Sequence, residues 1–240
     1  MTAPALPATR WAGAAHVFVD DVDAPVASTD DRHHLERVLR LRAGELVTVS
    51  DGRGRWRWVR VGGAFEPVGE VSVEPAAAPA LTIGFAVLKG ERNELVVQKL
   101  TELGIDTIVP VLAERCVVRW DGERSGRQHE RLRRVAHEAS MQSRRVWLPT
   151  VEPVRAFADL AREGAASGTM ALASIEGPAP TLRHTTVLVG PEGGWSDTEH
   201  DSPLQRVSMG DLVLRAETAA ITSGAILAAL RSGLVFPYAT

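Results

Sequence analysis

The stretch VLVGPEGGWSDTE, from Val187 to Glu199, places a strand, a glycine turn and a helix start in direct succession. Thr186 to Val189 are β-branched or apolar residues typical of a buried strand, and Gly-Pro-Glu-Gly-Gly follows them at once. Ser196 and Glu199 then form a Ser/Thr-x-x-Glu capping box, which predicts that a helix begins there. Such a unit is suited to hold a small ligand, with a plain turn as the alternative.

Two further strand ends resemble this one. A predicted strand over Met170–Ser174 runs into Ile175-Glu176-Gly177, and a strand over Val207–Met209 runs into Gly210 and the stretch DLVLRAE. Parallel sheets bind ligands at the carboxyl ends of their strands, and glycines there let a ligand approach the backbone. The three strand ends therefore predict one small-molecule site.

The type of ligand follows partly by exclusion. The chain has no G-x-x-x-x-G-K-[ST] phosphate loop and no G-x-G-x-x-G dinucleotide fingerprint. A carboxylate at Glu192 would repel a bound phosphate, whereas free backbone groups, apolar walls and one carboxylate suit a cationic or zwitterionic ligand with an adenine ring. S-adenosylmethionine (SAM) has these properties and is the expected cofactor.

The overall composition is that of an ordinary globular chain. It has 240 residues, a net charge of −3 and 45% hydrophobic residues. The single cysteine, Cys116, excludes an internal disulfide and a cysteine-built zinc site, and no metal is expected. No apolar run has the length of a membrane span, and Pro4, Pro7 and Arg10 interrupt any signal sequence, so we expect a cytoplasmic protein without membrane contact.

The chain divides at a low-complexity joint, Pro75-Ala-Ala-Ala-Pro-Ala80, which predicts domains over 1–75 and 76–240. The first part has β-patterned runs at His16–Val19, Glu45–Ser50, Arg53–Val61 and Gly69–Val73, with Asp51-Gly52 as a hairpin turn and a helix near Asp31–Leu41. This pattern predicts a small β-barrel. Alternation of Arg53, Arg55 and Arg57 with Trp56 and Trp58 predicts an arginine face on one strand.

The second part alternates strands with helices, which predicts an α/β fold with a mostly parallel sheet. The expected strands are Leu81–Leu88, Ile105–Leu112, Met170–Ser174, Thr186–Val189 and Val207–Met209, and the expected helices are Asn93–Leu103, Gln128–Ser140, Arg155–Glu163 and Glu217–Arg231. The last helix is rich in alanine, serine and glycine. It therefore either packs tightly on the sheet or lies inside a crowded fold.

Arginine makes up nearly all of the basic residues, since Lys89 and Lys99 are the only lysines among 27 lysines and arginines. From Arg119 to Arg145 there are eight arginines against four acidic residues. The planar guanidinium suits phosphate better than lysine does, which favours a nucleic-acid partner. A GC-rich genome and solvated helix faces would give the same composition.

Four blocks together resemble one family: VGPEGGWS, SMGDLVLRAETA, KGERNELVVQKLTELGIDTIVP and HHLERVLRLRAGELVTVSDGRG, the first at residues 189–196. They are similar to the RsmE-type 16S ribosomal RNA (uracil-N3)-methyltransferases over nearly the whole chain. The resemblance implies a PUA-like β-barrel followed by a SPOUT methyltransferase domain with a deep C-terminal trefoil knot, an exception to the rule that chains avoid knots. It also implies a homodimer, with the cofactor pocket near the subunit interface, acting on the small ribosomal subunit.

The resemblance assigns the three glycine loops to SAM binding. The residues implied are Ala173, Ser174, Leu188, Gly190, Glu192, Gly193, Gly194, Met209, Gly210, Leu214 and Arg215. Uracil N3 must lose its proton to attack the methyl group, so a fixed cation that stabilises the developing anion is expected. Arg215 is the leading candidate, with Glu217 or Glu192 as the orienting or proton-accepting partner. A structural Arg215–Glu217 pair is the alternative, and His33, His34 and His137 are less favoured bases.

RNA binding is expected from basic residues of both parts, with a flipped-out uridine reaching the pocket. These residues are Arg37, Arg40, Arg42, Arg53, Arg55, Arg57, Lys89, Arg92, Lys99, Arg144 and Arg145. Two departures from the family pattern stand out. Met141 and Arg144 occupy positions of a Glu-x-x-Glu-Gln-Ser-Gly-Arg block where the family has glutamate and glycine, and Pro203 shortens the helix after Gly194.

Three alternatives remain at this stage. A SPOUT ribose 2′-O-methyltransferase is disfavoured by the barrel-first order and the Leu-Arg-Ala-Glu-Thr-Ala block. A non-catalytic RNA-binding or assembly factor is disfavoured by the intact glycine loops, and SAM binding would discriminate it. A nucleotide-phosphate enzyme is disfavoured because no phosphate loop is present. The mildly acidic net charge favours assembled small subunits over free RNA as substrate.

Overall fold

The computed structural model describes residues 6–7, 9–29, 31, 35, 37 and 39–236. The chain forms two compact units, unit 1 with Met1–Ala76 and Ser140–Leu148, and unit 2 with Ala77–Ala139 and Pro149–Thr240. The first division, between Ala76 and Ala77, falls within the predicted joint Pro75–Ala80. The sequence did not indicate that residues 140–148 belong to unit 1. The assignment of 1–75 and 76–240 as functional domains stays a prediction.

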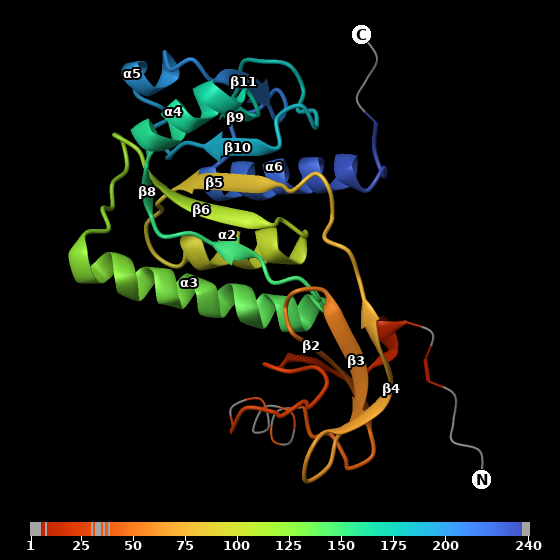
Figure 1. Ribbon diagram of the computed structural model, residues 1–240. Helices are drawn as coiled ribbons and strands as arrows, with labels where there is room; N and C mark the ends of the chain where they lie inside the picture. Colours follow the sequence, from red (N-terminus) through yellow and green to blue (C-terminus); the bar gives the residue numbers. More distant parts are fainter. Residues whose placement is uncertain are drawn as a thin grey trace. The chain divides into compact units, whose positions relative to one another are not determined.

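Unit 1 contains a four-stranded sheet in the order β1-β2-β3-β4 (Figure 1). The strands are β1 (His16–Phe18), β2 (Leu46–Ser50), β3 (Arg55–Arg60) and β4 (Glu66–Val73), preceded by a 3-10 turn, η1 (Arg10–Ala12). β1 pairs with β2 in parallel, and the other neighbours are antiparallel. All four predicted strands are confirmed, with ends shifted by a few residues. Much of the predicted helix Asp31–Leu41, including His33, His34 and Val38, lies outside the described residues.

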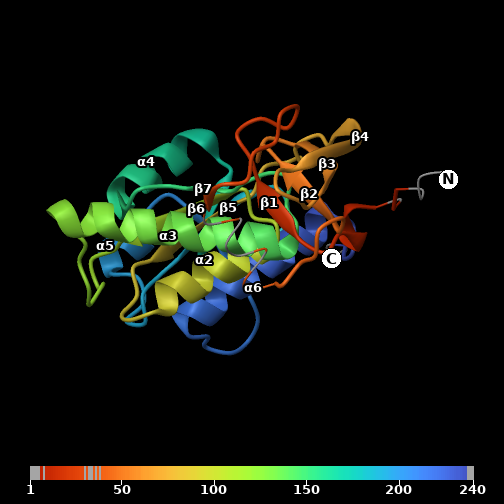
Figure 2. The same cartoon turned by 90° about the horizontal axis from the view of Figure 1, so that it is seen from below.

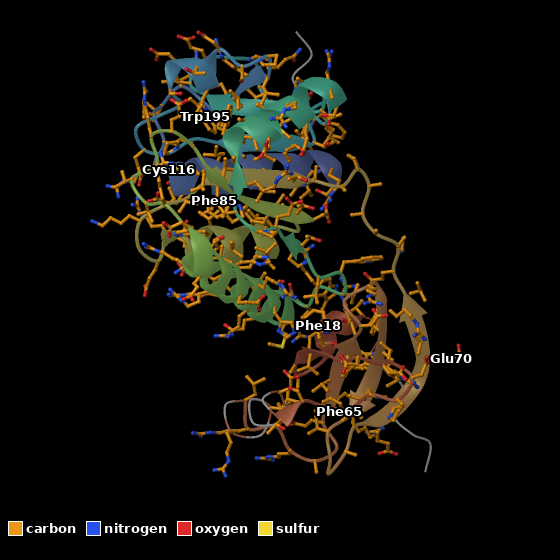
Figure 3. The ribbon with its side chains drawn as sticks, turned by 60° about the vertical axis from the view of Figure 1, so that its left-hand side comes forward. Phe18, Phe65, Glu70, Phe85, Cys116 and Trp195 are labelled. Carbon is orange, nitrogen blue, oxygen red and sulfur yellow. The ribbon has the colours of Figure 1, made fainter. Side chains whose placement is uncertain are left out.

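The core of unit 1 consists of small branched side chains on one face of the sheet. Val17, Val47, Val49 and Val59 are buried, and Leu35 packs with them. Phe65 is partly buried against this cluster, whereas Phe18 stacks edge-on against His16 (Figure 3). The valines of β2 alternate with Thr48 and Ser50, which are also buried and form hydrogen bonds with the His16 ring, so β2 is buried on both faces.

The connection between β2 and β3 differs from the predicted two-residue hairpin turn. The loop has four residues, Asp51–Gly54, because Asp51 Oδ1 accepts hydrogen bonds from the backbone N–H groups of Arg53 (2.8 Å) and Arg55 (3.2 Å). Gly54 has φ +95° and donates to the carbonyl of Val146, while the Leu148 N–H donates to Gly52. Residues 146–148 thus line the hairpin, which explains their place in unit 1.

Unit 2 contains a wholly parallel sheet in the order β11-β9-β10-β5-β6-β7, with β8 also paired to β6. The strands are β5 (Thr82–Ala86), β6 (Thr107–Leu112), β7 (Thr150–Val151), β8 (Arg155–Ala156), β9 (Met170–Ser174), β10 (Thr186–Val189) and β11 (Gln205–Ser208). The predicted parallel α/β sheet is confirmed. The short strands β7 and β8 were not predicted, because two-residue strands have no readable period.

Helices cover both faces of this sheet, with α4 on the opposite side from α2 and α6 (Figure 2). They are α2 (Arg92–Glu102), α3 (Gly122–Ser143), α4 (Phe157–Ser167), α5 (Asp197–His200) and α6 (Ala216–Arg231). The predicted start of α4 at Arg155 is wrong, because Arg155 and Ala156 pair with β6 as β8. α3 is longer than predicted, and its last turn from Ser140 belongs to unit 1.

The small residues of α6 are required by close packing. α6 contacts α2, β5 and β10, and Ala220 and Ser223 are fully buried. A Cβ atom at Gly224 would lie 2.5 Å from Leu100 Cδ2, which is less than real contacts allow. Phe85 of β5 lies in the middle of the same core (Figure 3). Tight packing of α6 within unit 2, one of the two interpretations of its sequence, is confirmed.

Candidate functional site

A cavity of about 320 Å³ opens at the carboxyl ends of β9, β10 and β11. Its walls come from the three loops that follow these strands and from the start of α6, and they are mainly apolar. The volume lies in the range of small-molecule sites. The cavity lies at the strand ends where the glycine-rich loops predicted it.

Most of the residues expected to bind the cofactor line this cavity. They are Ala173, Ser174, Gly190, Glu192, Gly194, Met209, Gly210 and Leu214. Leu188 is fully buried in the core beneath the cavity, and Gly193 and Arg215 are adjacent in sequence to lining residues without lining it themselves. The structure therefore brings the three loops together as expected, and cofactor binding by each residue stays a prediction.

Glycines shape both walls of the cavity through the backbone. Gly194 has φ +69° and Gly210 has φ +132°, conformations that side-chain-bearing residues rarely adopt. The Gly194 N–H closes a turn on the carbonyl of Pro191 at 2.8 Å. The turn fixes the backbone of this wall, and binding of the cofactor by backbone groups stays a prediction.

Trp195 joins two walls of the cavity. Its indole Nε1 donates to the carbonyl of Ala173 at 3.2 Å, and a Cβ atom on Gly190 would lie 3.0 Å from the indole ring. The ring also packs against Phe157 of α4, with centroids 5.0 Å apart (Figure 3). The side chain of Trp195 thereby sets the spacing between the ends of β9 and β10.

The predicted capping box is confirmed at α5. Ser196 Oγ accepts from the Glu199 N–H, and the Glu199 carboxylate accepts from the Ser196 N–H at 3.0 Å. The helix has only four residues and ends before Pro203, as the sequence suggested. It brings His200 to the cavity wall, a residue that sequence reasoning missed, because its place depends on the tertiary position of this short helix.

Other lining residues were missed although their neighbours were predicted. They are Ile175, Val189, Pro191, Trp195, Leu212, Val213, Ala216 and Ala219. Leu212 and Val213 are about four-fifths exposed, at 79% and 86%. Their position between Gly210 and Leu214 was a usable signal, because exposed apolar residues in a binding loop suggest contact with a ligand or partner.

One arginine contacts both candidate carboxylates. Arg92, the first residue of α2, forms an ion pair with Glu192, and its Nη1 lies 3.5 Å from Glu217 Oε2. The Arg92 Nε also donates to the carbonyl of Lys89. These contacts bring Glu192 and Glu217 to the same guanidinium at the edge of the cavity.

Arg215 lies at the N-cap position of α6 and is exposed. Within the described part of the chain, its guanidinium forms no hydrogen bond or ion pair, and Glu217 faces Arg92 instead. The expected alternative, an Arg215–Glu217 structural pair, is therefore wrong. The less favoured base His137 lies on α3 and does not line the cavity.

The residues expected to bind RNA fall into two groups. Arg37, Arg40, Arg42, Arg53 and Lys89 are exposed, and their side chains make no hydrogen bond or ion pair among residues 6–7, 9–29, 31, 35, 37 and 39–236. The others have protein partners: Arg55 with Asp23, Arg57 with the carbonyls of Val22 and Gly69, Arg92 with Glu192, Lys99 with Glu102, Arg144 with the carbonyls of Arg10 and Trp11, and Arg145 with that of Trp147.

The predicted arginine face of β3 is therefore wrong in part. Arg55 and Arg57 are only partly exposed and stabilise unit 1 itself, which leaves Arg53 as the fully exposed member. Asp23 raises the pKa of Arg55 through its hydrogen bond and charge. The register between β3 and β4 shifts at Trp56 and Trp58 with the extra residues on β4, while β3 keeps a regular register with β2. RNA binding by all eleven residues stays a prediction.

The described residues contain neither a metal-binding cluster nor a membrane-spanning helix. No group of three or more histidine, cysteine, aspartate or glutamate side chains is placed to hold a metal ion. None of the helices among those residues has the length and apolar character needed to cross a membrane.

The fold is that of an α/β protein with a cavity at the carboxyl edge of a parallel sheet. Residues 76–228 match the sequence profile of the RNA methyltransferase domain, and residues 28–61 match that of the RNA methyltransferase PUA domain. The chain belongs to this RNA methyltransferase family.

Relatives of known name agree with this assignment. The chain is 33% identical over 222 residues to ribosomal RNA small subunit methyltransferase E of Mycobacterium bovis, covering 84% of this chain and 85% of the relative. It is 32% identical over 211 residues to the protein of that name from Synechocystis, with coverage of 80% and 68%.

Solved structures show the same fold. A Neisseria gonorrhoeae ribosomal RNA small subunit methyltransferase E bound to SAM has a TM-score of 0.76 and 26% identity, covering 90% of this chain and 97% of that one. The Legionella pneumophila protein Lpg2936, solved as a methyltransferase complex with SAM, has a TM-score of 0.76 and 27% identity, with coverage of 89% and 96%.

Proposed function

We propose that this RNA methyltransferase transfers a methyl group from SAM to N3 of one uridine in the 16S ribosomal RNA of the small ribosomal subunit. The observation that carries the proposal is the cavity at the carboxyl ends of β9, β10 and β11, which most of the expected cofactor residues line. The names of the relatives and the two SAM-bound neighbours support both the substrate and the cofactor.

The residues present fit SAM. Apolar side chains such as Met209, Leu212 and Leu214 form a wall for an adenine ring, and loop backbone groups supply hydrogen bonds. The Glu192 carboxylate lines the same cavity and matches a cationic ligand. Bound there, SAM supplies an electrophilic methyl group on its sulfonium. Holding the two reactants in line contributes up to roughly 7–11 kcal/mol in the best intramolecular cases.

The chain's own part in catalysis is to stabilise negative charge on uracil and to accept the N3 proton. Arg215 is the proposed cation, because its guanidinium is exposed beside Leu214 and Ala216 of the cavity and carries no protein partner in the described part. Glu217 is the proposed proton acceptor or orienting group. Glu192, whose side chain is 40% exposed and paired with Arg92, is the second candidate.

Four finer properties are proposed with this activity. They are a deep C-terminal trefoil knot, a homodimer with its pocket near the subunit interface, a cytoplasmic location, and assembled small subunits as the substrate. The knot is supported by the path of α6, which follows the edge strand β11 and returns to contact β5, β10 and α2. The dimer is supported by the exposed Leu212 and Val213 beside the cavity.

The decisive experiment is transfer of labelled methyl from SAM to small ribosomal subunits that lack the modification, followed by nucleoside mass spectrometry. We expect 3-methyluridine at a single site, and less transfer to free 16S RNA. Label on a ribose would instead assign the chain to the 2′-O-methyltransferases. SAM binding without transfer would favour an assembly factor, and equal labelling of free RNA and subunits would refute the preference for assembled subunits.

A further inference from the structure

Most of the glycine loop, Gly190–Trp195, lines the cavity, and three of its six residues are glycines. Its glycines have more conformational freedom than other residues, so a fixed shape requires contacts from outside the loop. The Gly194–Pro191 turn supplies one such contact within the loop. Further contacts come from Arg92, from Ala173 and from the turn that follows β6.

Arg115, in that turn, contacts the loop without lining the cavity. Its Nη1 donates to the carbonyl of Trp195 at 2.8 Å and to that of Gly193 at 3.2 Å. The aliphatic part of Arg115 covers Gly193, because a Cβ atom there would lie 3.5 Å from Arg115 Cβ and 3.7 Å from Cδ. Hydrogen bonds from a charged donor are stronger than neutral ones, so these contacts fix two of the loop's carbonyls.

Glu114, the residue before Arg115, forms a hydrogen bond with Glu199, which follows the glycine loop. Glu199 is 3% exposed, and its carboxylate accepts hydrogen bonds from the backbone N–H groups of Glu114 (2.7 Å) and Ser196 (3.0 Å). Glu114 and Arg115 are therefore bonded to both ends of the segment from Gly193 to Glu199. The ion pair of Arg115 with the fully exposed Asp197, at 3.4 Å, adds little.

We propose that Arg115 is a positioning residue, which holds the glycine loop in the shape that binds SAM. Arg115 does not line the cavity, so its effect reaches the cofactor only through Gly193 and Trp195. The carbonyls of these residues point to the guanidinium, and the Trp195 indole joins the loop to Ala173 on the opposite wall. The inference rests on the proposed use of SAM.

The test compares R115A, R115K and the control R183A. Arg183 is also exposed and in unit 2, but it is not among the residues that line the cavity, and its side chain has no partner in the described part. Two measurements are made: SAM binding by calorimetry, and amide hydrogen exchange of residues 190–199 without SAM. We expect R115A to weaken SAM binding about tenfold and to speed exchange in the loop. R115K keeps an aliphatic stem and a charged nitrogen with N–H donors, so it should show a smaller loss, and R183A should match the wild type.

The separate effects of R115A on KM and on kcat distinguish a positioning role of Arg115 from general destabilisation of the protein. With saturating SAM, R115A should keep kcat within about twofold while its KM for SAM rises about tenfold. The inference is wrong if R115A binds SAM with wild-type affinity and its loop exchanges at the wild-type rate. If R115A does not fold, wild-type SAM affinity and wild-type loop exchange in R115K would overturn the inference instead. A wild-type protein that binds no SAM would refute the proposed function, whereas the exchange measurement would still decide whether Arg115 holds the loop.

Discussion

Glu217 Oε2 lies 3.5 Å from Arg92 Nη1 and accepts no hydrogen bond within the described part of the chain. The Glu217 side chain is only 13% exposed, and Arg92 also pairs with Glu192. A buried carboxylate oxygen without a donor is costly, and such a group commonly serves a ligand or a reaction. Glu217 Oε2 is therefore a buried acceptor that no donor in the described part satisfies, which supports a proposed role for Glu217 in the reaction.

We predict that E217Q lowers kcat by about 100-fold, because the amide cannot accept the N3 proton. SAM affinity should not change, since Glu217 does not line the cavity. Methyl-transfer kinetics and SAM calorimetry check both statements. E70Q is the control, because Glu70 is an exposed glutamate on β4 of unit 1 (Figure 3). Equal kcat values for E217Q and E70Q would leave Glu217 with only a structural role beside Arg92.

Arg215 should be required for the chemical step. R215A removes the cation proposed to stabilise the uracil anion, and loss of one such group lowers kcat by about 100- to 1000-fold. R215K keeps the charge and should recover part of the rate. Single-turnover kinetics with the small subunit distinguish the possibilities, with R183A as the exposed-arginine control. A raised KM for RNA at constant kcat would show instead that Arg215 only binds RNA.

The cavity could be predicted from the sequence because each contributing loop follows a buried strand and contains glycine. Thr186–Val189 and Met170–Ser174 were predicted with the bounds that the structure has. The roles of Arg115 and Trp195 could not be predicted in this way. Arg115 contacts residues about 80 positions away, and local pattern carries no information about such partners.

The pairing of charged side chains could not be predicted from the sequence either. The sequence indicated which arginines exist, but not which are already paired: Arg92 contacts two glutamates, whereas Arg215 has no partner in the described part. The four-residue loop Asp51–Gly54 also depends on distant contacts, since Gly54 donates to Val146. Local sequence propensity predicts the helices and strands. Hydrogen bonds and ion pairs between distant residues determine the loop conformations at their ends and which side chains there are paired.

Arg144 illustrates a substitution whose effect is structural. Its φ is +57°, in the left-handed region that favours the glycine of the family pattern. Its Nη1 donates to the carbonyls of Trp11 at 2.6 Å and Arg10 at 3.1 Å, within unit 1. The side-chain bonds offset a backbone strain of about 1–2 kcal/mol.

We predict that R144A lowers the free energy of unfolding by about 1–3 kcal/mol, because it loses the hydrogen bonds and keeps the strain. R144G loses the same bonds but relieves the strain, so it should be about 1 kcal/mol more stable than R144A. Urea denaturation of the two variants measures the difference. If R144A keeps full stability and instead weakens RNA binding, Arg144 is an RNA contact as the sequence suggested.

Cys116 should be protected in the native protein. It is 8% exposed, and burial raises the pKa of its thiol above the ordinary value of 9.0. The native state therefore retains the proton when the unfolded state loses it, so this group lowers stability as pH rises above 9.0.

Because Cys116 is the chain's only cysteine, its labelling by a thiol reagent is unambiguous. We expect slow labelling of the native protein at about pH 8 and rapid labelling in urea. The apparent labelling rate should increase with the population of unfolded protein. Rapid, complete labelling under native conditions would contradict this expectation and would show that the turn after β6 opens locally.

Gly224 and Gly126 provide matched substitutions for the packing of α6. A Cβ atom at Gly224 would lie 2.5 Å from Leu100 Cδ2 and 3.4 Å from Ile105 Cγ1, and both of these residues are fully buried. Overpacking of this kind lowers the free energy of unfolding by about 1–3 kcal/mol, and the better helix propensity of alanine offsets about 1 kcal/mol of this loss.

We predict that G224A is destabilised by about 1–2 kcal/mol. G126A should be stabilised by up to about 1 kcal/mol, because a Cβ atom at Gly126 of α3 meets nothing within 4 Å. Both free energies of unfolding are measured in urea. If G224A is as stable as G126A, then α2 and α6 separate readily to admit a methyl group. The small residues of α6 would then reflect helix propensity, because close packing would not require them.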